Sequence, residues 1–247
     1  MVNLEEGVDG VKNTLWAVII GLCFIVGMLI VSYTFYKVKA LDNTLSVVGS
    51  ARMRVTSDIV RWTATFSTTI PEENLKDGYR RMSNDLNLIL EFYKKNGIDT
   101  KTLVISPVSV ERPWIYNNQQ EPKETILRQT VEMQSGDLEK ITTLAKNFQE
   151  LLDEGVNFST QSLEYYYSKL PDLRVELLTE AMNDAKARAE KIAQSSGKKV
   201  GSLKSASMGV VQVLAPNSTE VSDYGSYDTA TIEKEVMVTV RAVFLLK

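Results

Sequence analysis

Residues 181–201 read AMNDAKARAEKIAQSSGKKVG, and a small residue recurs at every fourth position of this stretch. Side chains four positions apart share one face of an α-helix. Small side chains on that face let the helix backbone lie close to a sheet or to another helix. We therefore interpret the stretch as a packing element and not as a catalytic one. Its small residues are Ala181, Ala185, Ala189, Ala193, Gly197 and Gly201.

The segments around this helix predict a mixed fold, because apolar residues repeat every second position in some and every third or fourth in others. The resulting order is ββαββαβαββ. Helices that follow neighbouring strands pack on one face of a mainly antiparallel sheet, so we predict an α+β fold with three helices. Strands are expected over 45–66 (a pair divided near Ser57 and Asp58), 102–111, 124–134, 159–168, 200–214 and 235–246, and helices over 72–96, 138–152 and 172–196.

Two polar segments are predicted to be loops. Residues 112–123 contain two prolines, and residues 215–233 join the last two strands. A loop as long as the second is usually functional or mobile. It carries acidic and hydroxyl side chains, but it lacks the alternating oxygen ligands of a calcium-binding EF-hand loop. We predict a subunit contact there, through Tyr224, Gly225, Tyr227 and Asp228.

An apolar run near the N-terminus predicts a membrane anchor. Residues 15–36 read LWAVIIGLCFIVGMLIVSYTFY, and no residue between Lys12 and Lys37 is charged. The run can cross about 30 Å of hydrocarbon as a helix, whereas a cleaved signal peptide would have a shorter apolar region and a more basic start. The flanking charges do not decide the orientation. We predict a tail over 1–14, a transmembrane helix over 15–36, a juxtamembrane linker over 37–44 and one domain over 45–247.

Composition excludes several classes of function. The chain has no histidine, which removes Ser-His-Asp and Cys-His catalytic arrangements and the usual zinc sites. Its one cysteine, Cys23, lies in the apolar run, so we expect neither disulfides nor thiol chemistry in the soluble part. Acidic and basic residues are mixed along a chain of net charge −3, so nucleic acid is not an expected partner. We predict no enzyme activity, no cofactor and no metal.

Two motifs connect the soluble part with a known family. One is the helix with small residues at every fourth position and its exit from Gly197 to Gly201. The other is the strand Val47-Val48-Gly49-Ser50-Ala51, followed by Asp58. In these motifs the sequence, over roughly 45–247, resembles the SIMPL-domain family, which includes the YggE-like proteins and the periplasmic immunogenic protein of brucellae. The resemblance implies an extracytoplasmic α+β domain that forms ring-like or hollow homo-oligomers, with a link to envelope or oxidative stress and no established catalytic residues.

These observations lead to two hypotheses about function. The first is a structural or assembly protein of the bacterial envelope, held in the inner membrane by residues 15–36, with its domain in the periplasm and bound to copies of itself. The second is a tethered binding module that captures a peptide, an envelope polymer or a small ligand in a cleft between sheet and loop. The first predicts a large oligomer in detergent, and the second predicts that a ligand raises the melting temperature.

Overall fold

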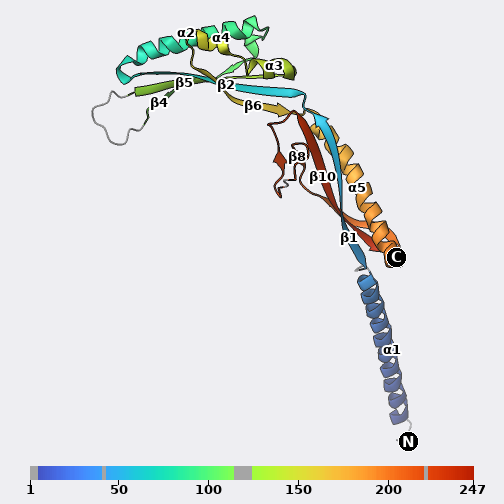
Figure 1. Cartoon of the computed structure of the whole chain (residues 1–247). Coiled ribbons are helices and arrows are strands. Elements are labelled where there is room, and N and C mark those ends of the chain that lie inside the picture. Colours follow the sequence, from blue (N-terminus) through green and yellow to red (C-terminus); the bar gives the residue numbers. More distant parts are fainter. Residues whose placement is uncertain (1–4, 41–42, 114–123, 220–221) are drawn as a thin grey trace. The chain divides into compact units, whose positions relative to one another are not determined.

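The structure is a computed structural model of the chain, and it describes residues 5–40, 43–113, 124–219 and 222–247 (Figure 1). These residues form two compact units, each built from segments that are distant in the sequence. Helices combine with mostly antiparallel sheets, which confirms the predicted α+β class. Unit 1 consists of Met1–Ser50, Leu178–Gly209 and Thr239–Lys247, and unit 2 consists of Ala51–Leu177 and Val210–Val238.

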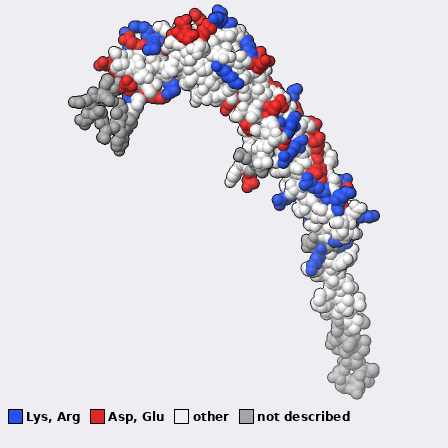
Figure 2. All heavy atoms as spheres, in the orientation of Figure 1, with Lys and Arg blue, Asp and Glu red and all other residues white. Residues whose placement is uncertain are grey.

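The N-terminal helix, α1, spans Glu5–Ala40, so it extends beyond the predicted 15–36 at both ends and includes residues 37–40 of the predicted linker. Within it, Val18–Lys39 is long and apolar enough to cross a membrane, and this segment makes no buried contact with the rest of the protein. Figure 2 shows that its surface carries almost no charge. An exposed apolar helix of this length is consistent with single-pass anchoring in a bilayer.

Unit 2 contains a five-stranded antiparallel sheet with helices on one face. Figure 1 shows α2, α3 and α4 above this sheet. The strands follow the order β3–β5–β2–β6, and β4 also pairs with β5. Because the helices cover only one face, residues on alternate positions of β2 and β5 are buried. The elements are β2 (Ile59–Pro71), α2 (Leu75–Lys95), β3 (Val104–Ile105), β4 (Ser109–Glu111), β5 (Glu124–Ser135), α3 (Leu138–Leu144), α4 (Gln149–Asp153) and β6 (Phe158–Tyr166).

An aromatic cluster lies at the centre of this unit. The fully buried Trp62 of β2 packs edge-to-face against Tyr93, with ring centroids 5.4 Å apart, and against Phe158, with centroids 6.0 Å apart. Its indole Nε1 donates a hydrogen bond of 3.1 Å to Thr160 Oγ1. The Tyr93 hydroxyl has no hydrogen-bond partner among the described residues, and burial raises its pKa. The cluster therefore joins α2 to the sheet through apolar contact and not through that hydroxyl.

Asp85 is an ionisable residue of α2 that is only 8% exposed. Burial raises the pKa of its carboxyl group, and the charge of Arg81 only partly opposes this effect. A carboxyl group with a raised pKa binds its proton more tightly in the folded state, so the protein loses stability as the pH rises from the unfolded pKa, 3.8, through the folded one. We expect Asp85→Asn to unfold at a higher urea concentration than the parent at neutral pH. The two midpoints should converge near pH 3, and a difference independent of pH would contradict the assignment.

Unit 1 contains β7 (Val200–Met208) and parts of three longer elements, namely α5 (Leu170–Ser195) from Leu178, β1 (Thr44–Thr56) up to Ser50 and β10 (Glu233–Leu246) from Thr239. Its buried core joins Ala185 and Ala189 of α5 to the strand residues Val47, Ala242 and Phe244. The sheet follows the order β1–β10–β8–β9, with β7 also beside β10; β10 is antiparallel to β7 and β8, and β8 is parallel to β9. The strands β8 (Gln212–Leu214) and β9 (Ser226–Tyr227) belong to unit 2.

The helix predicted over 138–152 is two helices, so the described residues after α1 form four α-helices and not three. The break follows Ala145, whose carbonyl oxygen accepts a 2.8 Å hydrogen bond from Thr160 Oγ1 of β6. The last helical hydrogen bond before the break is that of the Asn147 N–H, which donates to the carbonyl groups of Thr143 and Leu144 at 3.1 Å each. The Thr160 hydroxyl on β6 thus replaces the backbone N–H that would donate to the Ala145 carbonyl in a continuous helix. The chain changes direction there, and α4 begins at Gln149.

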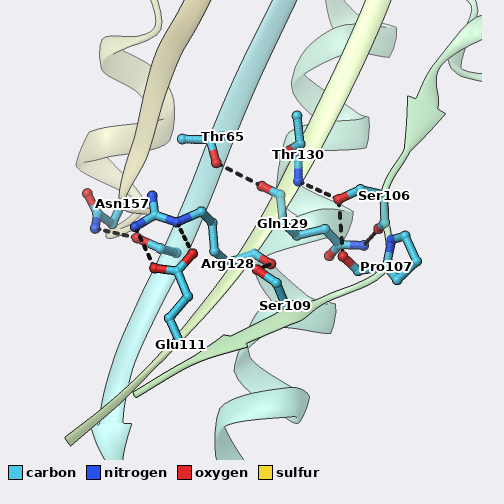
Figure 3. A network of polar contacts seen from close by, with 10 residues as sticks. Thr65, Ser106, Pro107, Ser109, Glu111, Arg128, Gln129, Thr130 and Asn157 are labelled. Atoms are coloured by element: carbon cyan, nitrogen blue, oxygen red, sulfur yellow. Dashed lines mark hydrogen bonds and ion pairs between the residues drawn. The ribbon is translucent and has the colours of Figure 1, made fainter. Parts of the chain in front are cut away.

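The strand predicted over 102–111 is also two strands, β3 and β4, with Ser106 and Pro107 between them (Figure 3). Pro107 has no N–H to donate to a ladder. Ser106 replaces part of the pairing, because its Oγ accepts from Thr130 N at 2.9 Å and its carbonyl accepts from Gln129 Nε2 at 2.7 Å. The strand predicted over 200–214 likewise divides into β7 and β8, before and after Gly209. The predicted loop 112–123 lies mostly outside the described residues.

Candidate functional site

The second half of the predicted loop 215–233, from Ser222, is folded onto the strands of unit 2. Its strand β9 pairs in parallel with β8, with Tyr227 opposite Val213. The N–H of Asp228 then donates to the carbonyl of Val213 at 2.8 Å, and the carbonyl of Thr229 accepts from Tyr165 N of β6 at 2.8 Å. These backbone bonds hold the second half of the loop between two strands.

One buried amide side chain fixes the middle of the loop. Gln212, in β8, is 3% exposed. Its Nε2 donates to the carbonyl of Ser222 at 2.5 Å, and its Oε1 accepts from Ser226 Oγ at 2.9 Å. Both ends of the amide are therefore satisfied by the loop, as a buried polar group requires.

Lys234 holds the end of the loop from inside the protein. Its side chain is fully buried, and its Nζ donates to the carbonyl groups of Asp228 and of Thr231, the latter at 2.7 Å. The same nitrogen lies 3.6 Å from Asp228 Oδ2. Burial lowers the pKa of Lys234, and the charge of Asp228 and its hydrogen bond oppose this shift. The Lys234 ammonium group thus holds together the two ends of the turn over residues 228–231.

Asp228 is the acidic partner in this turn. Its carboxylate accepts from Ala230 N at 3.1 Å, from Thr231 N at 3.2 Å and from the Thr231 hydroxyl. Burial by itself would raise the pKa of Asp228, but these hydrogen bonds and the charge of Lys234 outweigh burial and lower it. The carboxylate is therefore ionised at neutral pH, and its hydrogen bonds close the turn.

A row of alternating aromatic and cationic groups lies beside the turn. The Tyr227 ring has its centroid 5.7 Å from Lys234 Nζ and 5.8 Å from the centroid of Tyr166. On Tyr166 lies the guanidinium of Arg61, 4.9 Å from the ring centroid, and Arg61 also forms an ion pair with Glu164 at 3.0 Å. These contacts join β2 and β6 to the loop. Tyr227 is 37% exposed.

A pocket of about 730 Å³ opens between β8 and the loop. Apolar residues of β8 lie on one side of it, and hydroxyl side chains of the loop lie on the other. Such walls combine apolar contact with hydrogen-bond donors and acceptors. Among the residues that the structure describes, no group of His, Cys, Asp and Glu is arranged to hold a metal ion. The lining residues are Val213, Leu214, Ala215, Ser218, Thr219, Ser222, Ser226, Tyr227 and Asp228.

The four residues predicted to contact another subunit have different surroundings. Tyr224 is 96% exposed. Gly225 adopts φ +86°, and a Cβ there would lie 3.1 Å from the Val211 carbonyl oxygen, so the turn favours glycine. Tyr227 and Asp228 are engaged within unit 2, as described above. Subunit contact through this loop remains a prediction, and it rests mainly on Tyr224.

Asp58 lies in the turn between β1 and β2 and closes a second turn after β6. Its carboxylate accepts from the N–H of Ser168 at 2.7 Å and from the Ser168 hydroxyl at 2.5 Å, while its own N–H donates to the Tyr166 carbonyl. Burial opposes ionisation of Asp58, but the hydrogen bonds from Ser168 and the charge of Lys169 lower its pKa overall. Its role within unit 2 is to hold two chain reversals together.

The small residues of α5 lie where helix and sheet meet in unit 1. A Cβ on Gly49 of β1 would lie 2.2 Å from the carbonyl oxygen of Ala181 and 2.4 Å from the nitrogen of Ala185. Gly197 ends the helix with φ +70°, and a Cβ on Gly201 would lie 2.9 Å from the Leu245 carbonyl oxygen. The strand backbones thus approach their neighbours more closely than side chains allow. The buried alanines are Ala181, Ala185, Ala189 and Ala193.

Sequence reasoning missed Lys234, although the sequence contained a signal for it. In the strand from Glu235, the inward residues are Val236, Val238 and Val240. Lys234 precedes them in the same register, so its side chain is directed to the buried face. A lysine in that register needs acceptors in the protein, and these come from the turn at Asp228, which no local pattern indicated.

The fold and these sites define a class: an α+β domain with an N-terminal helix long and apolar enough to anchor it in a membrane. A protein family matches residues 45–244, and its description is SIMPL, a protein of unknown function (DUF541). The chain belongs to the SIMPL family, which confirms the resemblance found in its motifs. No curated protein matches the chain.

Proposed function

We propose that this chain is an assembly protein of the bacterial envelope: α1 anchors it in the inner membrane, and its extracytoplasmic domain associates with copies of itself. The family and the apolar N-terminal helix support the anchored domain. The self-association rests on one structural observation, the open edge of β7.

The link to envelope or oxidative stress is part of the proposal, and a strain lacking the protein should survive peroxide or detergent less well than its parent.

The open edge lies in unit 1. β7 pairs with β10 along one side, and no strand among the described residues pairs with its other side. Every residue from Ser202 to Met208 is exposed, including the apolar Leu203 at 45% and Met208 at 46%. A strand edge with exposed backbone and apolar side chains is a template for pairing with another chain.

At the opposite edge of this sheet, formed by β1, a side chain of α5 binds a backbone N–H. At Ser50 of β1, the backbone N–H donates to Asp184 Oδ2 of α5 at 2.8 Å. This hydrogen bond and the neighbouring Arg188 lower the pKa of Asp184. The helix thus occupies a backbone donor on the β1 edge, whereas every residue of β7 from Ser202 to Met208 is exposed. We therefore assign the contact between copies to β7.

Light scattering of the full-length protein in mild detergent tests this assignment. We expect a large, defined oligomer, and we expect Leu203→Lys with Met208→Lys to reduce its mass, because two added charges on β7 repel a paired copy. The matched control is Val104→Lys with Val175→Lys, at two apolar residues that are each 65% exposed elsewhere. A monomeric parent would contradict the proposal, and an equal loss of mass in both variants would contradict the assignment to β7.

The pocket beside β8 supports a second candidate, a tethered module that binds a peptide, an envelope polymer or a small ligand. It lies between sheet and loop, and its walls join apolar residues to hydroxyl groups. Binding at this pocket would raise the melting temperature of the full-length protein. If no fraction prepared from the cell envelope changes the melting temperature, this candidate has no support.

A further inference from the structure

We propose that one end of unit 1, formed by Lys198, Lys199 and Lys247, binds the headgroups of anionic phospholipids in the membrane that holds α1. This inference rests on the membrane anchoring in the proposed function and is independent of the oligomeric state. Its partner is a lipid surface.

Three distant parts of the chain meet at this end. The N–H of Leu246 donates to the carbonyl of Asn43 at 2.8 Å, which places the end of β10 beside the residue that precedes β1. Lys199 and Lys247 exchange two backbone hydrogen bonds, of 2.9 and 2.8 Å. The Nζ of Lys198 donates to Asn43 Oδ1 at 2.9 Å. The three lysines are therefore held around Asn43.

Asn43 cannot be far from the membrane. The segment that can cross the bilayer ends at Lys39, and α1 ends at Ala40, three residues before Asn43. Since a chain covers at most about 3.6 Å per residue, the Cα atom of Asn43 lies within about 11 Å of that of Ala40. This limit holds for any path of the connecting residues. The Lys198 ammonium, bonded to Asn43, is thus kept near the headgroup layer, which is roughly 5–8 Å deep on each side of the hydrocarbon.

The charge at this end is positive and not neutralised. Lys199 and Lys247 are exposed, and their ammonium groups form no ion pair with any residue in the described part of the chain. Lys198 bonds to a neutral amide oxygen and keeps its charge available. Figure 2 shows basic side chains gathered around the end of α5 and the C-terminus.

Other charged residues close by in the sequence leave this end positive, because two cations and two acidic residues offset each other. Lys37 and Lys39 in the last turn of α1 contribute two further cations. The acidic residues adjacent in the sequence are Asp42 and Glu190. Lysines within a Debye length of an anionic bilayer, about 8 Å at physiological ionic strength, attract it with an energy that adds from one residue to the next. Such a cluster fits phosphate headgroups better than it fits a neutral ligand.

Acylation of lysines in the full-length protein tests the proposal. The chain is reconstituted in nanodiscs of phosphatidylcholine, with or without one third phosphatidylglycerol, and treated briefly with an amine-reactive ester. We expect acylation of Lys198, Lys199 and Lys247, measured by mass spectrometry, to be about threefold slower in the anionic discs and to recover in high salt. The reference residues are Lys94, Lys101 and Lys146, which are exposed lysines of unit 2 and should not change.

Lysine variants show whether the three side chains bind lipid headgroups or only lie near them. In vesicles that contain spin-labelled lipids, the parent should prefer phosphatidylglycerol over phosphatidylcholine. Replacing the three lysines by glutamine should reduce this preference, while the same change at Lys94, Lys101 and Lys146 should not. Equal acylation in both kinds of disc, equal slowing at the reference lysines, or an unchanged lipid preference would each overturn the proposal. Failure of the chain to elute with the discs would instead refute the membrane anchor.

Discussion

Gly49→Ala is expected to lower the free energy of unfolding of unit 1 by about 3 kcal/mol. The added Cβ would lie 2.2 Å from the Ala181 carbonyl oxygen and 2.4 Å from the Ala185 nitrogen, which are helix backbone atoms. Backbone atoms cannot rotate away as a side chain can, so either β1 or α5 must move. The movement would open the contact in which Val47, Ala185 and Ala189 are buried.

Hydrogen exchange followed by mass spectrometry measures this effect locally. Peptides that cover 44–50 and 181–193 should exchange faster in Gly49→Ala, while peptides of the Trp62 cluster should change much less. Gly136→Ala is the matched control, because a Cβ at Gly136 would meet its nearest atom, the Asp58 carbonyl oxygen, at an ordinary 3.6 Å. Wild-type exchange in Gly49→Ala would show that β1 does not lie against the helix backbone.

Lys234→Met is expected to destabilise unit 2 by about 3 kcal/mol, the lower end of the range for removing one member of a buried ion pair, because Asp228 is partly exposed. Methionine fills a similar volume, but it cannot donate to the carbonyl groups of Asp228 and Thr231. The Asp228 carboxylate would also lose the cation that helps to lower its pKa. The turn over 228–231 should therefore open, and with it the wall of the pocket beside β8.

Urea unfolding followed by the fluorescence of tryptophan, including the buried Trp62, measures the change in stability. Limited proteolysis should in addition cut Lys234→Met between Ser222 and Glu233 before the parent. Lys191→Met removes the same charge from an exposed position of α5 and should change the urea midpoint little. If Lys234→Met and Lys191→Met unfold alike, the buried ammonium does not stabilise the turn.

Local patterns in the sequence predicted those elements whose side chains repeat regularly. The small residues of α5 indicated a close-packed helix, and alternation indicated the strands β2, β5 and β10. The uncharged run before Lys37 indicated the helix that can span a membrane. These predictions depend only on residues a few positions apart, since the geometry of one helix or strand decides which side chains share a face.

The breaks in these elements could not be predicted in this way. Ala145 ends α3 because Thr160, on a strand, bonds to its carbonyl oxygen. Ser106 separates β3 from β4 because its side chain and carbonyl bond to residues of β5. In both cases the hydrogen-bond partner is at least 15 residues away in the sequence. The periodic pattern of apolar residues therefore continues through the break and does not indicate it.

By itself, the sequence determined the α+β class, the apolar N-terminal helix, the family and the packing face of α5. Only the tertiary structure decided which polar groups meet. It joined Ser50 to Asp184, 134 residues away, and Arg61 to Glu164, 103 residues away. It also buried Lys234 within the turn at Asp228 and gathered three lysines around Asn43. The physical reason is that periodicity shows which face of an element is buried, whereas a polar group's partner depends on which other elements fold against that face.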